Sequence, residues 1–107
     1  MSAMKRVLTI AGSDCSGGAG IQADIKTMSA HGVYAMSVIV SVVAENTVHV
    51  LKKQDIAPEI VRAQVDAIYE DIGTDAVKIG MLPTPEVMSA VAESCANTVR
   101  RTSLLTL

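Results

Sequence analysis

A glycine-rich segment near the start of the chain limits the folds open to it. Residues 11–24 read AGSDCSGGAGIQAD, directly after an apolar run at 7–10 and directly before a helical pattern. A strand that enters such a turn and then a helix leaves free backbone N–H groups, which can bind an anion or a polar small molecule. Glycine suits the turn because a backbone that approaches a ligand closely has no room for a Cβ atom. A tight connection that binds nothing is an equally good interpretation of the turn alone.

The turn matches neither of two common nucleotide-binding motifs. Gly12 and Gly17 have the glycine spacing of a P-loop, but Gly18 and Ala19 stand where Lys and Ser or Thr are needed. The Gly-x-Gly-x-x-Gly pattern of dinucleotide-binding folds does not occur. The turn therefore indicates a ligand without naming a nucleotide.

Apolar runs alternate with helical patterns along the rest of the chain. We expect buried strands over 7–11, 38–43 and 76–79, with a short extra strand over 47–51. Helices are expected from 21 to Gly32, from Pro58 to Gly73, and from Thr84 and Pro85 onward. The last helix should bury an apolar face made of Val87, Met88, Val91, Ala92 and Cys95. This succession predicts an α/β fold with three parallel strands and crossover helices.

Composition excludes several classes of function. Half of the 107 residues are hydrophobic, but Phe and Trp are absent, so the core must be aliphatic. A net charge of −2 gives no electrostatic case for nucleic acid or an anionic membrane as partner. The two cysteines lack metal-ligand spacing and no segment has the length of a signal or a membrane span. We therefore expect a cytoplasmic protein.

Three charged residues lie at positions where ligands often bind. Asp24 is expected in the first turn of its helix, where the helix dipole favours a carboxylate. The dipole and contact with a ligand explain Asp24 equally well. Glu45 follows the apolar run at 38–43, and ligands bind at the carboxyl ends of parallel strands, although a solvated loop residue explains it equally. Lys78 reads as an ordinary edge or snorkelling residue.

The histidines and the first cysteine carry weaker signals. His31 and His49 have no metal-ligand partners at useful spacing, so both are expected to be structural, and no metal site is predicted. Cys15 stands beside a helix N-terminus, which lowers a thiol pKa, but we interpret it as a small turn residue.

Three motifs together resemble one family. LTIAGSDCSGGAGIQADIKT, AENT and VKIGML, within residues 4–94, are similar in order and spacing to the hydroxymethylpyrimidine/phosphomethylpyrimidine kinases of thiamine biosynthesis. These enzymes belong to the ribokinase-like superfamily, and pyridoxal kinases share a weaker version of the first motif. The resemblance implies the N-terminal portion of a three-layer α/β/α sandwich. It also implies ATP with Mg²⁺ as cofactors of the full-length enzyme, a small-molecule pyrimidine substrate and a homo-oligomer.

The resemblance assigns roles by motif position. Gly12 and Asp24 would line the pyrimidine pocket, and Glu45 would hydrogen-bond the aminopyrimidine. Met81 would pack on the ring. His49 departs from the family, which usually has glycine there, so the resemblance does not extend to the loop that follows.

The family's catalytic half has no counterpart here. Its Asp-Pro-Val-Met strand, ATP site, glycine-rich anion hole and catalytic base all follow the matched region. Because phosphoryl transfer depends on such groups, we expect residues 1–94 to form the N-terminal part of a kinase domain that is inactive alone. We name no catalytic residue, and we expect ATP and Mg²⁺ to bind this chain poorly.

Residues 95–107 lose the helical and strand periodicity. The amino acids from Ser94 to Leu107 can be translated back into codons and reread one nucleotide earlier, starting from the last base of the Ser94 codon. One choice of codons then encodes Leu-Arg-Lys-Tyr-Gly-Ala-Pro-His-Ile-Val-Ala-Asp-Pro. That sequence resembles the family's own continuation. We therefore expect residues 95–107 to be an out-of-frame tail.

Two other functions stay open. The chain could be a non-catalytic fragment that binds a small molecule or dimerises. It could also be a relative of the pyridoxal kinases, in which case pyridoxal would replace the pyrimidine.

Overall fold

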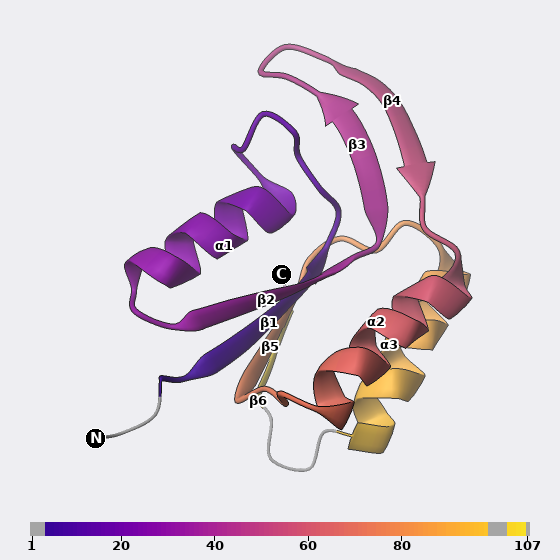
Figure 1. The fold of residues 1–107 in the computed structure, drawn as a ribbon. Coiled ribbons are helices and arrows are strands. Elements are labelled where there is room, and N and C mark those ends of the chain that lie inside the picture. Colours follow the sequence, from indigo (N-terminus) through magenta and orange to yellow (C-terminus); the bar gives the residue numbers. More distant parts are fainter. Residues whose placement is uncertain (1–3, 99–102, 107) are drawn as a thin grey trace.

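The apolar runs and helical patterns fold as an alternating α/β chain. The computed structural model describes residues 4–98 and 103–106. Its elements are β1 (Arg6–Ala11), α1 (Gly20–Ala30), β2 (Tyr34–Ile39), β3 (Ser41–Glu45), β4 (Val50–Asp55), α2 (Pro58–Glu70), β5 (Ala76–Ile79), α3 (Pro85–Thr98) and β6 (Ser103–Thr106) (Figure 1). No helix within these residues is long and apolar enough to cross a bilayer.

Four strands form a parallel sheet in the order β2-β1-β5-β6. Helix α1 covers one face of this sheet, and α2 and α3 lie together on the other (Figure 1). Ile10 in β1 is level with Val38 in β2 and with Ile79 in β5, so the three strands predicted from apolar runs are neighbours. The expected α/β/α layering with parallel strands is confirmed.

The apolar run at 38–43 is two strands, not one. β2 ends at Ile39 and β3 begins at Ser41, and Val40 between them bonds the carbonyl of Ala11 through its N–H. β3 then leaves the parallel sheet and pairs antiparallel with β4, forming a two-stranded ribbon. The run contains one polar residue, Ser41, but apolar residues on both sides of it do not reveal the change of partner.

The extra strand predicted at 47–51 lies a few residues later, over Val50–Asp55. The Asn46 side chain accepts the N–H groups of Val48 and His49, which closes the turn of the ribbon. This Asx-type turn takes up the residues where the strand was expected to start. Asp55 therefore ends β4, and Pro58 alone marks the start of α2.

The prediction of only three parallel strands is wrong, and the loss of periodicity after Cys95 does not end the regular structure there. Helix α3 continues to Thr98, and β6 pairs parallel with β5. Without β6, the edge of β5 would present unpaired N–H and C=O groups. Because pairing with this edge uses backbone groups, β6 can form without a periodic pattern of side chains.

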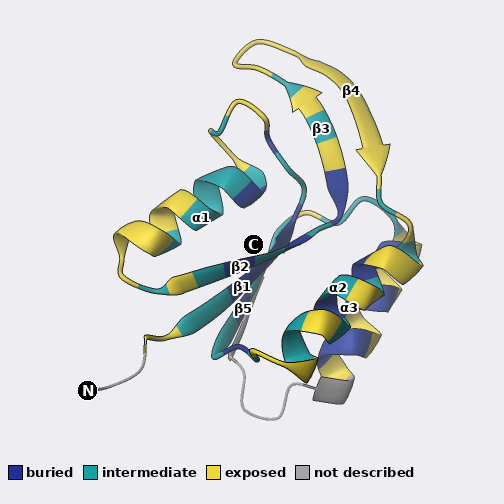
Figure 2. Cartoon of the chain, in the orientation of Figure 1, coloured by how far each residue is buried: buried dark blue, intermediate teal, exposed yellow. Residues whose placement is uncertain are grey.

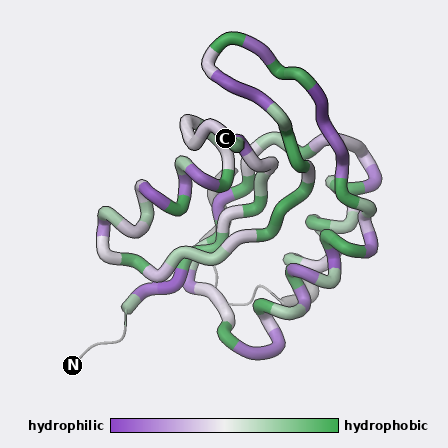
Figure 3. The backbone as a smooth tube through the Cα atoms, turned by 45° about the horizontal axis from the view of Figure 1, so that its top comes forward, coloured by the Kyte–Doolittle hydropathy of each residue, from purple (hydrophilic) through white to green (hydrophobic). Residues whose placement is uncertain are grey.

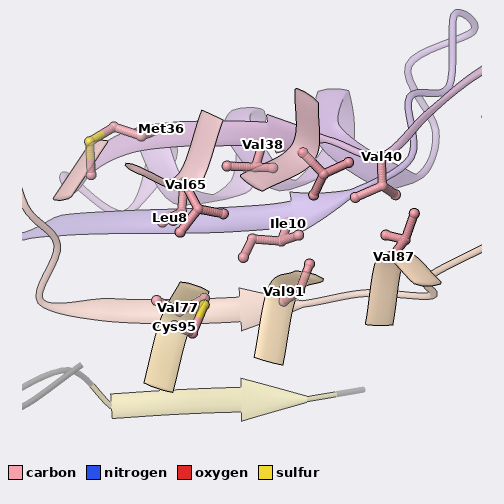
Figure 4. Packing of buried hydrophobic residues seen from close by; sticks show 11 residues of the cluster. Leu8, Ile10, Met36, Val38, Val40, Val65, Val77, Val87, Val91 and Cys95 are labelled. Atoms are coloured by element: carbon pink, nitrogen blue, oxygen red, sulfur yellow. The ribbon is translucent and has the colours of Figure 1, made fainter. Parts of the chain in front are cut away.

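The core fills the space between the sheet and the α2/α3 layer. Leu8 and Ile10 from β1, Val77 from β5, and Val87 and Val91 from α3 point into it and are at most 1% exposed (Figure 4). The predicted face of α3 is partly wrong. Met88 is half exposed and Ala92 is exposed, whereas Ala90 and Ser94 are buried, so the buried stripe is rotated from the predicted one.

The ribbon stands away from the sheet. Every residue of β4 is exposed, whereas β3 alternates between exposed and less exposed residues (Figure 2). Hydrophobic and hydrophilic stretches both occur along the ribbon (Figure 3). One face of β3 is therefore turned toward the body of the molecule.

Candidate functional site

An open cavity of about 610 Å³ lies where the glycine-rich turn, the ribbon and the end of β5 meet. Fourteen residues from these three parts line it, and those used below are Gly12, Ser41, Val43, Glu45, Lys53, Lys78, Gly80 and Met81. The volume is within the range of small-molecule sites in proteins, which is roughly 300–1,000 Å³.

The glycines of the turn are required by close packing. Gly20 has φ +56°, and a Cβ atom there would lie 2.3 Å from the Gly12 carbonyl oxygen. That oxygen accepts the N–H of Ile21 at 3.0 Å. A Cβ atom on Gly12 would lie 2.6 Å from the Ser41 hydroxyl oxygen. The turn is thus packed against both the start of α1 and the start of β3.

The backbone N–H groups of the turn mostly bind the protein itself. Asp14 is buried, and its carboxylate accepts hydrogen bonds from the Ser16 N–H and hydroxyl and from the Gly18 N–H. These bonds, the Ser16 hydroxyl first, hold the pKa of Asp14 below its usual 3.8. The N–H groups of Ser13 and Gly17 donate to the carbonyls of Ser41 and Asp14. The expectation that the turn offers free N–H groups to a ligand is therefore wrong at these positions.

Alternate residues of β3 face the cavity. Ser41, Val43 and Glu45 line it, as expected for side chains two apart on one face of a strand. The expectation that Glu45 ends a parallel strand is wrong, because β3 belongs to the antiparallel ribbon. Removal from water raises the pKa of Glu45 above its usual 4.5, and the negative charge of Asp14 adds to the rise. Its carboxyl group therefore takes up a proton more readily than a solvated one.

Cys15 connects the turn to the ribbon. Its thiol donates to the Glu45 carbonyl oxygen at 3.0 Å, and the Glu45 N–H points to the sulfur at 3.4 Å. The side chain is exposed, as expected for a turn residue. Cys15 therefore helps to fix the end of β3 beside the glycine turn.

Asp24 and Lys78 form an ion pair under α1. The Asp24 Oδ2 atom lies 2.8 Å from Lys78 Nζ and accepts the Thr9 hydroxyl at 2.6 Å. Helix α1 begins at Gly20 and has no acidic residue in its first turn, so the predicted role of Asp24 at the helix dipole is wrong. Lys78 belongs to β5, which lies between β1 and β6, so its interpretation as an edge residue is also wrong.

The structure brings three of the four predicted site residues together. Gly12, Glu45 and Met81 line the cavity, and Met81 is 90% exposed. The fourth residue, Asp24, is not among the described residues that line the cavity. Lys78 lines the cavity instead, and Asp24 lies behind the Lys78 ammonium group.

Lys78 and Lys53 were missed as cavity residues. A signal for Lys78 was present in the sequence. A charged residue inside an apolar strand must find a buried partner. Lys53 gave no signal, because its place depends on the register of the ribbon, in which it is level with Val43.

Metal ligands are not grouped in the described part of the chain. No three His, Cys, Asp or Glu side chains among these residues lie close enough together to hold a metal ion.

Comparison with known proteins connects this geometry to a family. The sequence model of the family described as phosphomethylpyrimidine kinase matches residues 14–105. The hydroxymethylpyrimidine/phosphomethylpyrimidine kinase of Escherichia coli strain K12 is 53% identical over 92 residues, which cover 84% of this chain and 35% of that protein.

Solved structures agree with the sequence comparison. A phosphomethylpyrimidine kinase from Clostridium difficile 630 superimposes with a TM-score of 0.91 at 46% identity, covering 95% of this chain and 44% of that one. An ADP complex of Bacillus subtilis pyridoxal kinase gives a TM-score of 0.85 at 38% identity, covering 95% and 41%. The chain thus spans about a third of the length of the E. coli relative and less than half of either solved chain.

These matches confirm the resemblance drawn from the three motifs and the ribokinase-like fold. They also agree with the cavity, to which each of the three motifs contributes at least one residue. The chain belongs to the phosphomethylpyrimidine kinase family.

Proposed function

We propose that this chain forms the pyrimidine-binding side of a hydroxymethylpyrimidine/phosphomethylpyrimidine kinase. The observation that carries the proposal is the meeting of Gly12, Glu45 and Met81 in one cavity, although they are up to 69 residues apart in sequence (81 minus 12). Membership of the family supports the choice of ligand.

Each of the three residues has a role that its chemistry suits. The Glu45 carboxylate accepts a hydrogen bond from the amino group of the pyrimidine, at the less exposed face of β3. The Met81 thioether is exposed at the cavity and packs on an aromatic ring. Gly12 has no side chain, which lets the turn pack against the Ser41 hydroxyl at the wall of the cavity.

We propose that the chain alone does not transfer phosphate. Phosphoryl transfer needs groups that position the nucleotide and stabilise the charge of the transferred group. In the proposed account, the full-length relatives bind ATP and Mg²⁺ through residues outside the matched region. The chain should therefore show no transfer from MgATP to 4-amino-5-hydroxymethyl-2-methylpyrimidine.

Pyridoxal is the second candidate ligand. The structural similarity to the B. subtilis pyridoxal kinase favours it. Pyridoxal lacks the amino group that Glu45 would recognise, so the pyrimidine should bind more tightly.

Isothermal titration calorimetry tests the proposal. The chain is titrated with the hydroxymethylpyrimidine and with pyridoxal, each with and without MgATP. We expect saturable binding of the pyrimidine, weaker binding of pyridoxal, and no effect of MgATP on either. Tighter binding of pyridoxal than of the pyrimidine would favour pyridoxal as the ligand. If the chain bound neither compound, both candidate functions would be contradicted.

We also propose that residues 95–107 are read out of the family's frame. The proposal is supported by the second bases of the alternative codons, which are mostly fixed by the amino acids present and give the apolar and polar order of the family's continuation, whereas codon degeneracy leaves the first bases partly free. Reading the gene's nucleotides tests it. The expected codons after Ser94 encode the kinase continuation in the alternative frame, and codons that cannot do so would overturn the proposal.

A further inference from the structure

The ammonium group of Lys78 lies between a partly buried carboxylate and the cavity. Lys78 lines the cavity, and its side chain is only 15% exposed. On its other side it pairs with Asp24, whose side chain is 19% exposed. Thr9 is level with Lys78 in the neighbouring strand and bonds the same carboxylate oxygen. The pair is therefore held from below by the sheet and from one side by α1.

The ammonium has donors to spare. A Lys ammonium carries three N–H groups, and Asp24 is the partner shown for it among the described residues. A Cβ atom on Gly80 would lie 3.2 Å from Lys78 Nζ and 3.2 Å from the Ala11 Cβ. Glycine at this position therefore leaves the ammonium uncovered on the side of the cavity.

Stability alone is a weak reason for such a pair. Removing two charges from water costs free energy that their attraction only partly offsets, and apolar residues of similar volume often serve as well. A role toward a ligand explains why the charge lies at the cavity wall. Among the described residues, Asp14 and Glu45 are the two carboxylates that line the cavity, and that of Asp14 is hydrogen-bonded within the turn. A ligand in the cavity therefore meets the Glu45 carboxylate as an acceptor at the ribbon and the Lys78 ammonium as a donor at the sheet.

We propose that Lys78 binds the alcohol oxygen of the ligand. This inference rests on the proposed function. With the amino group of the pyrimidine bound at Glu45, the hydroxymethyl group accepts a hydrogen bond from the Lys78 ammonium. Asp24 and Thr9 do not touch the ligand and hold the ammonium in place. Asp24, which the motif places in the pocket, thus acts through Lys78.

A pair of ligands that differ by one oxygen tests the contact. The first is 4-amino-5-hydroxymethyl-2-methylpyrimidine, and the second is 4-amino-2,5-dimethylpyrimidine, which has a methyl group in place of the alcohol. We expect the wild-type chain to prefer the first by about 10-fold or more, as is usual for a hydrogen bond to a charged group. In Lys78→Met this preference should fall to within about 2-fold, with binding of the dimethyl compound little changed.

Two further variants keep the test decisive. Lys52→Met removes an exposed lysine from the ribbon and should keep the wild-type preference. If Lys78→Met does not fold because Asp24 loses its partner, the Asp24→Asn/Lys78→Met double variant removes both charges and is measured instead.

The outcomes separate this inference from the proposed function. A preference for the alcohol that survives in the Lys78 variants, with both ligands weakened equally, means that Lys78 is structural, and it overturns the inference alone. Failure of the wild-type chain to bind either pyrimidine overturns the proposed function and the inference with it.

Discussion

Lys78 Nζ lies 2.8 Å from Asp24 Oδ2, although the two residues are 54 positions apart in sequence. The pair joins β5 to α1 on the face of the sheet opposite the apolar core. Because Thr9 in β1 bonds the same oxygen, two neighbouring strands and the helix above them meet at one carboxylate. This face of the sheet therefore combines a polar cluster with apolar packing, whereas the α2 and α3 face carries the aliphatic core.

Substitution of Gly20 should damage the turn more than substitution of another glycine with positive φ. Gly20→Ala would place a methyl group 2.3 Å from the Gly12 carbonyl, in addition to the strain of φ +56°. We expect a loss of at least ~2 kcal/mol in the free energy of unfolding, measured by urea denaturation.

Gly32→Ala is the matched control for this turn. Its φ is +78°, but a Cβ atom there meets nothing within 4 Å. Only the backbone strain of about 1–2 kcal/mol should remain. Equal losses in the two variants would contradict the close packing of Gly20 against Gly12.

The aliphatic core should be sensitive to the loss of a single side chain. Leu8 is 0% exposed in β1, so Leu8→Ala should lower the free energy of unfolding by about 2–5 kcal/mol. Leu51→Ala makes the same chemical change at a residue 67% exposed in β4 and should cost less than about 0.5 kcal/mol. Thermal and urea unfolding of both variants measure the difference, and a costly Leu51→Ala would show that the ribbon is packed against something.

The charge of Asp14 should be visible in the titration of Glu45. Burial and then the Asp14 charge raise the Glu45 pKa, so Asp14→Asn should lower it part of the way toward 4.5. Carboxyl ¹³C NMR measures this, with Asp71→Asn in an exposed turn as control. An unchanged Glu45 pKa in Asp14→Asn would assign the whole shift to burial.

The same shift has a consequence for stability. Glu45 binds its proton more tightly in the folded chain, so its ionisation opposes folding. Its contribution to stability should fall as pH rises from 4.5 through the raised pKa. Glu45→Gln should remove this part of the pH dependence, and an unaltered profile would contradict it.

Elements with a repeating apolar pattern were predictable from the sequence. β1, α1, α2 and β5 lie where periodicity and glycine or proline boundaries put them. Thr84 caps α3 as expected, since its hydroxyl accepts the Val87 N–H at 3.1 Å. These features depend on neighbouring residues only, so local patterns suffice.

Features that depend on distant partners were not predictable. The ribbon arises because β3 leaves the parallel sheet after Val40 and pairs with β4, and the one polar residue there, Ser41, does not indicate a change of partner. The residues next to Lys78 in sequence indicate an edge residue, because its partner Asp24 is on another element. The carboxylate of Asp14, likewise, accepts hydrogen bonds from N–H groups of the turn that the sequence predicts to be free for a ligand.

Mapping the pyrimidine on the ¹⁵N-labelled chain by NMR tests the central claim most directly. With 4-amino-5-hydroxymethyl-2-methylpyrimidine, we predict saturable shifts that are largest for the amides of Gly12, Val43, Glu45, Gly80 and Met81, which line the cavity. Largest shifts on the outer face of the ribbon or on α2, or no saturable shifts, would contradict the account.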